Sequence, residues 1–344
     1  MKARTMQTDS FVYPYDPAPP IGGSSEIQSG IHWIRLPAPY KGMDHVNVWL
    51  LEDGDSWTLV DTGPPDKDTT LAWEQLFDTL LAGRPITRII ATHHHPDHIG
   101  LGAWMRKQFA SQIWMTPIEY ELLEGSLSSA HPQHAELEER FYHMHGLQDI
   151  PDWSLPDNIS MASTFPLEHT VEDNEYITIG NRQWQVIVTG GHTPEHFVLS
   201  CQEDKILIGG DLLLPTISSN VGVYPRLPEA NPLECLFTLI DRLKGFPANT
   251  LVLPSHETPY LGLSVKLQNL DQRYQPRLKT ITQVCTTPHT AYELLPEIFK
   301  YKLSGMTLSL AMREMIAYLN YLHGKAIIES SCDTDGLCRF QKCV

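Results

Sequence analysis

Short apolar runs alternate with amphipathic segments through the first part of the chain. The runs at 31–37, 45–53 and 56–63 are bounded by turn residues and predict three successive strands. Apolar positions at helical spacing follow at 67–82 and predict a helix. The run at 86–93 then predicts a buried strand that leads directly into a group of histidines.

A second strand-rich block follows a polar, mostly helical insert at 117–165. The other elements expected in this region are helices at 100–110 and 231–244 and strands at 112–116, 175–179, 183–190, 196–201, 205–211 and 250–256. Two strand-rich blocks with helices between them are typical of two sheets packed face to face with helices outside, rather than of one alternating parallel sheet. The sequence therefore predicts an α+β fold.

Both ends of the chain differ from this central pattern. Residues 1–25 are rich in proline and glycine and predict an extended arm without a core of its own. Residues 261–344 predict three helices and a short β-like wing, and they carry a net charge of +3, whereas residues 1–260 carry −19. We therefore expect a domain of residues 26–260, which contains the insert at 117–165, and a separate C-terminal domain.

The charge of the whole chain limits the class of partner. A net charge of −16 argues against a general nucleic-acid binder, because phosphate contacts need a basic surface, and it fits a small-molecule substrate better. No apolar run approaches the roughly 20 residues that span a bilayer. No apolar segment follows the basic residues near the N-terminus, so we expect no signal peptide and a cytoplasmic location.

The six cysteines fall into two groups. Cys201, Cys235 and Cys285 lie in apolar or helical stretches, and we expect them to be reduced and buried. The others, Cys332, Cys338 and Cys343, gather near the C-terminus. Three thiols without a fourth ligand make a poor structural zinc site, so we assign them no role.

The segment THHHPDHIG, at 92–100, carries the strongest chemical signal. A hydrolytic metal site needs neutral imidazoles and carboxylates that converge and leave a position open for water. His93 and His95 are alternate residues at the end of a strand, so their side chains point the same way and can share one ion. The proline that follows turns the chain, so that Asp97 and His98 aim at a neighbouring position.

Three more candidate ligands stand at the ends of later apolar strands. His192 follows a strand and two glycines, which let the backbone come close to a site. Asp211 follows the strand ILIGG, and His256 follows the strand LVLPS. A buried and unpaired carboxylate or imidazole at each of three strand ends would be costly, and a pair of metal ions accounts for all three.

Together these motifs resemble those of the metallo-β-lactamase-fold hydrolases. The matching motifs are LVDTG (59–63), HxHxDH (93–98), GGHTPEH (190–196), GGD (209–211) and SH (255–256). They arrive in the family's order, and the resemblance covers about residues 26–256. It implies a four-layer αβ/βα sandwich with the site at one edge. Residues 263–340 resemble the winged-helix extension of the subgroup that includes lactamase-like protein 2, an endoribonuclease.

The resemblance assigns the metal ligands residue by residue. His93, His95 and His192 would hold the first metal, Asp97, His98 and His256 the second, and Asp211 would bridge them. Asp61 matches a family aspartate that we expect to act from outside the ligand shell. The predicted catalytic residues are therefore Asp97, Asp211 and Asp61. Two positions need comment: Glu195 replaces a glycine of the family's HTPGH motif, and His94 stands at a variable position and is not an expected ligand.

The implied cofactors are two divalent metal ions. Three imidazoles and a carboxylate favour Zn²⁺ at the first site, with Fe or Mn as alternatives. A hydroxide shared by two cations about 3.5–4 Å apart would attack the substrate. A histidine at position 95, where the di-iron flavoprotein relatives have glutamate, argues against redox chemistry.

These features predict a dinuclear metal-dependent hydrolase of a small ester, thioester or lactone. One alternative is a metal-dependent endoribonuclease guided by the C-terminal domain, and another is a ligand-binding or signalling protein with weak turnover. A homodimer is a further expectation. Candidate substrate contacts are Asn220 and Tyr224, in the loop after Asp211, and His134 in the insert.

Overall fold

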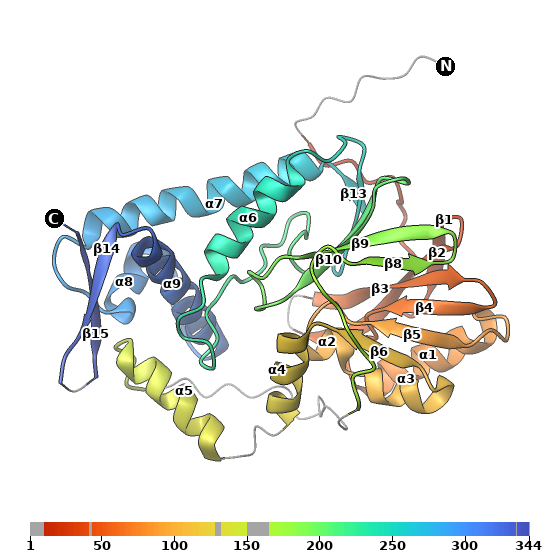
Figure 1. Ribbon diagram of the computed structural model, residues 1–344, viewed down its shortest axis with the longest axis horizontal. Helices are drawn as coiled ribbons and strands as arrows, with labels where there is room; N and C mark the ends of the chain where they lie inside the picture. The colour runs from red at the N-terminus through yellow and green to blue at the C-terminus, as the bar shows by residue number, and fades with distance from the viewer. Residues whose placement is uncertain (1–9, 41–42, 128–131, 150–164, 335, 344) are drawn as a thin grey trace.

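The computed structural model describes residues 10–40, 43–127, 132–149, 165–334 and 336–343 (Figure 1). Two β-sheets pack face to face, and helices cover the outer face of each sheet. The predicted four-layer sandwich with additional C-terminal helices is thus confirmed. Among the described helices, none is both long and apolar enough to cross a membrane.

The first sheet comes from the N-terminal part of the chain, and its described strands lie in chain order. They are β1 (Ser24–Gln28), β2 (Ile31–Tyr40), β3 (Met43–Asp53), β4 (Ser56–Val60), β5 (Ile86–Ile90), β6 (Gln112–Met115) and β7 (His169–Thr170). Neighbours pair antiparallel from β1 to β4 and parallel from β4 to β7. The carboxyl ends of β4 and β5 therefore meet at the same edge of the sheet.

The second sheet carries the later candidate ligands. Its described strands, in spatial order, are β13 (Tyr260–Leu261), β12 (Leu251–Pro254), β11 (Ile206–Gly210), β10 (Phe197–Cys201), β9 (Arg182–Val188) and β8 (Tyr176–Ile179). Strands β11 and β12 pair parallel, with Gly210 opposite Pro254, and the other neighbours pair antiparallel. Asp211 and His256 therefore emerge close together at one edge of this sheet.

Three apolar cores define the four layers. Trp33 and Trp184 belong to the core between the two sheets. Trp73 and Met105 come from helices on the outer face of the first sheet, and Leu236 comes from a helix on the outer face of the second. The covering helices are α1 (Lys67–Thr79) and α3 (Gly102–Phe109) on the first sheet, and α6 (Pro232–Leu243) and α7 (Leu263–Val284) on the second.

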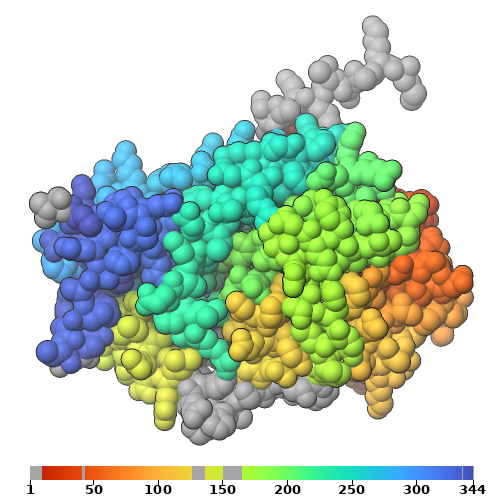
Figure 2. Space-filling model, viewed as in Figure 1, coloured from red at the N-terminus to blue at the C-terminus, as the bar shows by residue number. Residues whose placement is uncertain are grey.

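The C-terminal helices pack against the predicted insert. The elements concerned are α4 (Pro117–Leu127) and α5 (Pro132–Met144) of the insert, and α8 (Ala291–Ile298), α9 (Met306–Gly324) and the hairpin of β14 (Ile328–Cys332) and β15 (Cys338–Lys342). Arg313 of α9 donates to Glu138 and to the Tyr142 hydroxyl of α5, both at 3.0 Å. Figure 2 shows α5, in yellow, beside the blue C-terminal segment at one end of the molecule.

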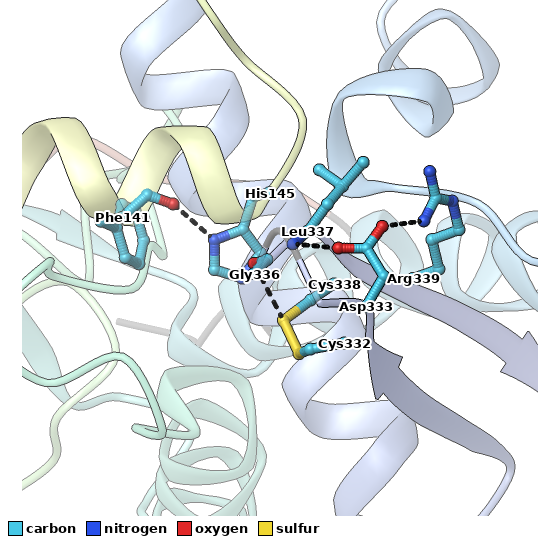
Figure 3. The surroundings of a disulfide bond; sticks show 8 residues. All are labelled: Phe141, His145, Cys332, Asp333, Gly336, Leu337, Cys338 and Arg339. Carbon is cyan, nitrogen blue, oxygen red and sulfur yellow. Dashed lines mark hydrogen bonds and ion pairs between the residues drawn. A yellow bond between two sulfur atoms is a disulfide. The ribbon is translucent and has the colours of Figure 1, made fainter.

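A disulfide bond joins Cys332 to Cys338 and closes the hairpin β14–β15 (Figure 3). Asp333, next to the first cysteine, forms an ion pair with Arg339 at 2.8 Å. Nothing in the spacing of the C-terminal thiols predicted this bond. The three thiols expected to be reduced are free, and two of them are buried as predicted, whereas Cys235 is only half-buried.

The strand that leads into the histidine cluster is shorter than predicted. Strand β5 ends at Ile90 instead of continuing to His93, so that part of the prediction was wrong. The physical reason is that the N–H of Thr92 donates to the Asp61 carboxylate at 2.8 Å rather than to a neighbouring strand. Pro96 then begins the four-residue helix α2 (Pro96–Ile99), where a proline at the first position is favourable. Strands β1, β7 and β13 were not predicted.

Candidate metal centre

Three histidines and one carboxylate oxygen form the first group of converging atoms. Nδ1 of His95 lies 3.0 Å from Nε2 of His93 and 3.0 Å from Nε2 of His192. Oδ2 of Asp211 lies 3.3 Å from Nε2 of His192. Ligand atoms that lie this close together can share a single cation.

Asp97, His98 and His256 form a second group on the other side of Asp211. Nε2 of His98 lies 3.3 Å from Oδ1 of Asp211 and 3.7 Å from Oδ2 of Asp97. Nε2 of His256 lies 3.5 Å from each of the same two oxygens. Because one oxygen of Asp211 faces each group, this carboxylate stands between them. The structure therefore brings all seven predicted ligands together, while their binding of metal remains a prediction.

Each of the five histidines is also held through its other ring nitrogen. The partners are Thr92 Oγ1 for His93 (3.0 Å), Tyr224 Oη for His95 (2.9 Å), Ser219 Oγ for His192 (2.7 Å), Asp61 Oδ2 for His98 (2.8 Å) and the His45 carbonyl for His256 (2.8 Å). Outer contacts of this kind fix the tautomer and orientation of imidazole ligands. Asp61 thus occupies the outer position that the resemblance implies.

The chemistry of the donor set fits divalent metal ions. Among the described residues, Nε2 of His98, Nε2 of His256 and Oδ1 of Asp211 are buried without a hydrogen-bond partner. Unpaired buried polar atoms are costly, and a cation would satisfy all three. Burial, reinforced by the neighbouring imidazoles, lowers the pKa of His93 and His95 well below the ordinary value. Both rings are therefore neutral, which is the form that binds metal. In the second group burial is outweighed by the charges of Asp211 and Asp97, which raise the pKa of His98 and His256, so a cation would displace their protons.

A buried carboxylate from the insert connects the two loops that carry the first group. Glu119, in the first turn of α4, is fully buried. Its Oε2 accepts from the His94 N–H at 3.1 Å and lies 2.5 Å from Nδ1 of that ring, and its Oε1 accepts from the Glu195 N–H at 2.8 Å. Burial raises the pKa of Glu119, but the pairing with His94 outweighs it and lowers the pKa below its ordinary value. His94 thus bonds Glu119 and is a member of neither ligand group of the described residues.

A second residue that the sequence analysis missed supports Asp211. His196 is fully buried, and its Nε2 accepts the backbone N–H of Asp211 at 3.2 Å. Burial, together with the charge of His192, lowers the pKa of His196 to about 3, so its ring is neutral at ordinary pH. His196 belongs to the motif GGHTPEH, and this position was the available signal. No sequence signal pointed to Glu119, because the insert has no pattern of its own.

The predicted substrate contacts have different outcomes. Tyr224 lies at the centre, where its hydroxyl contacts His95. The backbone carbonyl of Asn220 accepts from Nδ1 of His192 at 3.1 Å, so that residue also lies beside the centre. The side chain of His134 lies outside the described residues. Contact of these side chains with a substrate remains a prediction.

Comparisons with known proteins agree with this geometry. Residues 42–256 match a family model described as the metallo-beta-lactamase superfamily, and residues 278–343 match one described as a metallo-beta-lactamase-like C-terminal domain. A solved structure of a beta-lactamase domain protein from Burkholderia ambifaria has a TM-score of 0.85 at 32% identity and 98% coverage of both chains. The probable metallo-hydrolase YqjP of Bacillus subtilis is 26% identical over 86% of this chain and 93% of its own. A hydroxyacylglutathione hydrolase from a Marinomonas species is 24% identical over 64% of each chain.

Proposed function

This chain belongs to the metallo-beta-lactamase superfamily, and we propose that it is a dinuclear metal-dependent hydrolase of small esters, thioesters or lactones. The observation that carries the proposal is the pair of ligand groups on either side of Asp211, whose two oxygens face one group each. Two zinc ions bound there would supply a Lewis acid and an activated water for hydrolysis.

The residues of the chain would hold this pair in a fixed geometry. His196 holds the backbone of Asp211, and Asp61 holds the ring of His98, so that both sides of the bridging carboxylate are fixed. Tyr224 does the same for His95 in the first group. Preorganised ligands need no reorganisation when charge develops in the reaction, and this is the main source of electrostatic catalysis.

Two observations favour a small carbonyl substrate. The net charge of −16 disfavours a polyanionic substrate such as RNA. The name of one relative states that it hydrolyses hydroxyacylglutathione, which is an acylated thiol. Thioesters and their oxygen analogues therefore head the proposed substrates, and the RNA alternative is an outcome of the test.

The test is a substrate panel run on the zinc-loaded protein and on the protein stripped by a chelator. We expect turnover of at least one thioester, lactone or aryl ester by the loaded protein, and loss of that turnover after stripping. Replacement of Asp211 by Ala is expected to abolish it as well. Cleavage of single-stranded RNA without turnover of any carbonyl compound would contradict the proposal, as would full activity after stripping.

A further inference from the structure

The hydroxyl of Tyr40 is buried and has no hydrogen-bond partner among the residues that the structure describes. Tyr40 is the last residue of β2, in the hairpin that this strand forms with β3. Buried hydroxyls in folded proteins are nearly always paired, because an unpaired one has lost its contacts with water. A bound molecule is one way to supply the missing acceptor.

This end of the hairpin lies against the second ligand group. Across the hairpin, Tyr40 pairs with Met43, and the carbonyl of the nearby His45 holds Nδ1 of His256 at 2.8 Å. Burial raises the pKa of Tyr40 well above its ordinary value, and the charges of Asp97, Asp66 and Asp211 raise it further. The hydroxyl therefore stays protonated within the electrostatic influence of Asp97 and Asp211, and it can act only as a neutral hydrogen-bond donor or acceptor.

Three atoms of the metal centre also lack a hydrogen-bond partner among the described residues, but for a different reason. Nε2 of His98, Nε2 of His256 and Oδ1 of Asp211 are all atoms that can bind a metal ion, so a cation that displaces the imidazole protons would satisfy them. A phenol O–H also has a proton to donate, and a cation cannot accept it. An oxygen or nitrogen atom of a molecule bound at the centre can accept this proton.

We propose that the Tyr40 hydroxyl donates a hydrogen bond to the carbonyl oxygen of the substrate and stabilises the charge that develops there. This inference rests on the proposed function. When water attacks the carbonyl carbon, it releases a proton and the C=O bonding pair moves onto this oxygen. When the C=O bond re-forms, the bond to the leaving oxygen or sulfur breaks, and that atom takes up the proton that the water released. The proton stays on Tyr40 throughout, and the hydrogen bond strengthens as the oxygen becomes negative.

The test compares Tyr40→Phe with Tyr176→Phe, a matched control on β8 whose ring is 61% exposed. The first readout is binding of inorganic phosphate, a tetrahedral oxyanion, to the zinc-loaded protein by calorimetry. Loss of one hydrogen bond to a charged acceptor should raise the Kd at least about tenfold in Tyr40→Phe. The second readout is hydrolysis of a thioester, for which kcat should fall by about 10- to 100-fold with KM changed less than twofold.

Two further readouts separate this role from a structural one. Zinc content per chain should match that of the unmutated protein, and the urea midpoint of the metal-free protein should be unchanged or higher, because the substitution removes an unpaired hydroxyl. Unchanged phosphate binding, lost zinc or a lower midpoint would each overturn the proposal. If the unmutated protein cleaves no carbonyl compound while Tyr40→Phe still weakens phosphate binding, the proposed function fails and Tyr40 stands as an oxyanion donor.

Discussion

Glu119→Gln is expected to destabilise the protein although it changes only one group. The carboxylate of Glu119 bonds groups on two loops. One oxygen contacts the backbone N–H and Nδ1 of His94, and the other accepts from the backbone N–H of Glu195. A glutamine amide is the same size, but it has one acceptor oxygen and one NH₂ group. Whichever way the amide turns, an NH₂ group faces a buried N–H donor, and that donor loses its partner.

The magnitude follows from these contacts. A buried donor left unpaired costs about 1–3 kcal/mol, and a hydrogen bond to a charged group such as this carboxylate contributes about 1.5–3 kcal/mol. We expect the free energy of unfolding to fall by about 2–4 kcal/mol, because the amide keeps one of the bonds. With an m-value of about 3 kcal/mol/M, the urea midpoint should fall by about 1 M.

The assay is urea unfolding of the zinc-free protein, followed by fluorescence and circular dichroism. Glu121→Gln is the matched control, because Glu121 lies on the same helix and is exposed. Its midpoint should equal that of the unmutated protein. A Glu119→Gln midpoint that equals the control would refute the view that this carboxylate connects the two ligand loops.

Three other substitutions test contacts around the centre. The first is His196→Gln, which is compared with the unmutated protein by urea unfolding of the zinc-free forms. As the pH falls from 6.5 to 5, the free energy of unfolding of the unmutated protein should fall by about 2 kcal/mol more than that of the variant. The unmutated protein loses stability because His196 has a pKa of about 3 when folded, so that in this pH range the unfolded chain binds a proton at this residue and the folded chain does not. A difference in unfolding free energy between the two proteins that stays constant with pH would contradict this prediction. Tyr224→Phe should weaken zinc binding by about 10- to 100-fold in a chelator competition, because His95 loses its outer partner, and equal affinity would rule that role out. Gly210→Ala should lower the free energy of unfolding by at least about 2 kcal/mol in thermal or urea melts, because φ is +51° and a Cβ would lie 2.3 Å from Nε2 of His196; an unchanged melt would contradict this.

The parts of the centre that the sequence predicted are local in the chain. His93 and His95 follow one strand at a spacing of two, and Asp211 and His256 each follow an apolar run, so strand ends were enough to identify them. The short apolar runs that predicted the strands of both sheets are likewise local in the chain. The end of the strand before the cluster was harder to predict, because the N–H of Thr92 donates to the side chain of Asp61 instead of to a neighbouring strand.

The residues that the sequence did not reveal depend on contacts between distant segments. Glu119 meets His94 across 25 positions, and His196 meets the backbone of Asp211 across 15. In the sequence Tyr40 looks like an ordinary strand residue, and only the structure shows that its hydroxyl is buried without a partner among the described residues. A pattern of apolar positions contains no information on these pairings, which only the packing of helices and loops around the sheets creates.

The proposed function depends most on the position of Asp211 between two metal ions. The direct measurement is the zinc content of the purified and dialysed protein, by mass spectrometry of the metal, for the unmutated chain and for Asp211→Asn. We predict two zinc ions per unmutated chain, and fewer in the variant because its amide offers only one oxygen to the two groups. One ion or none in the unmutated chain, or two retained in Asp211→Asn, would contradict the account.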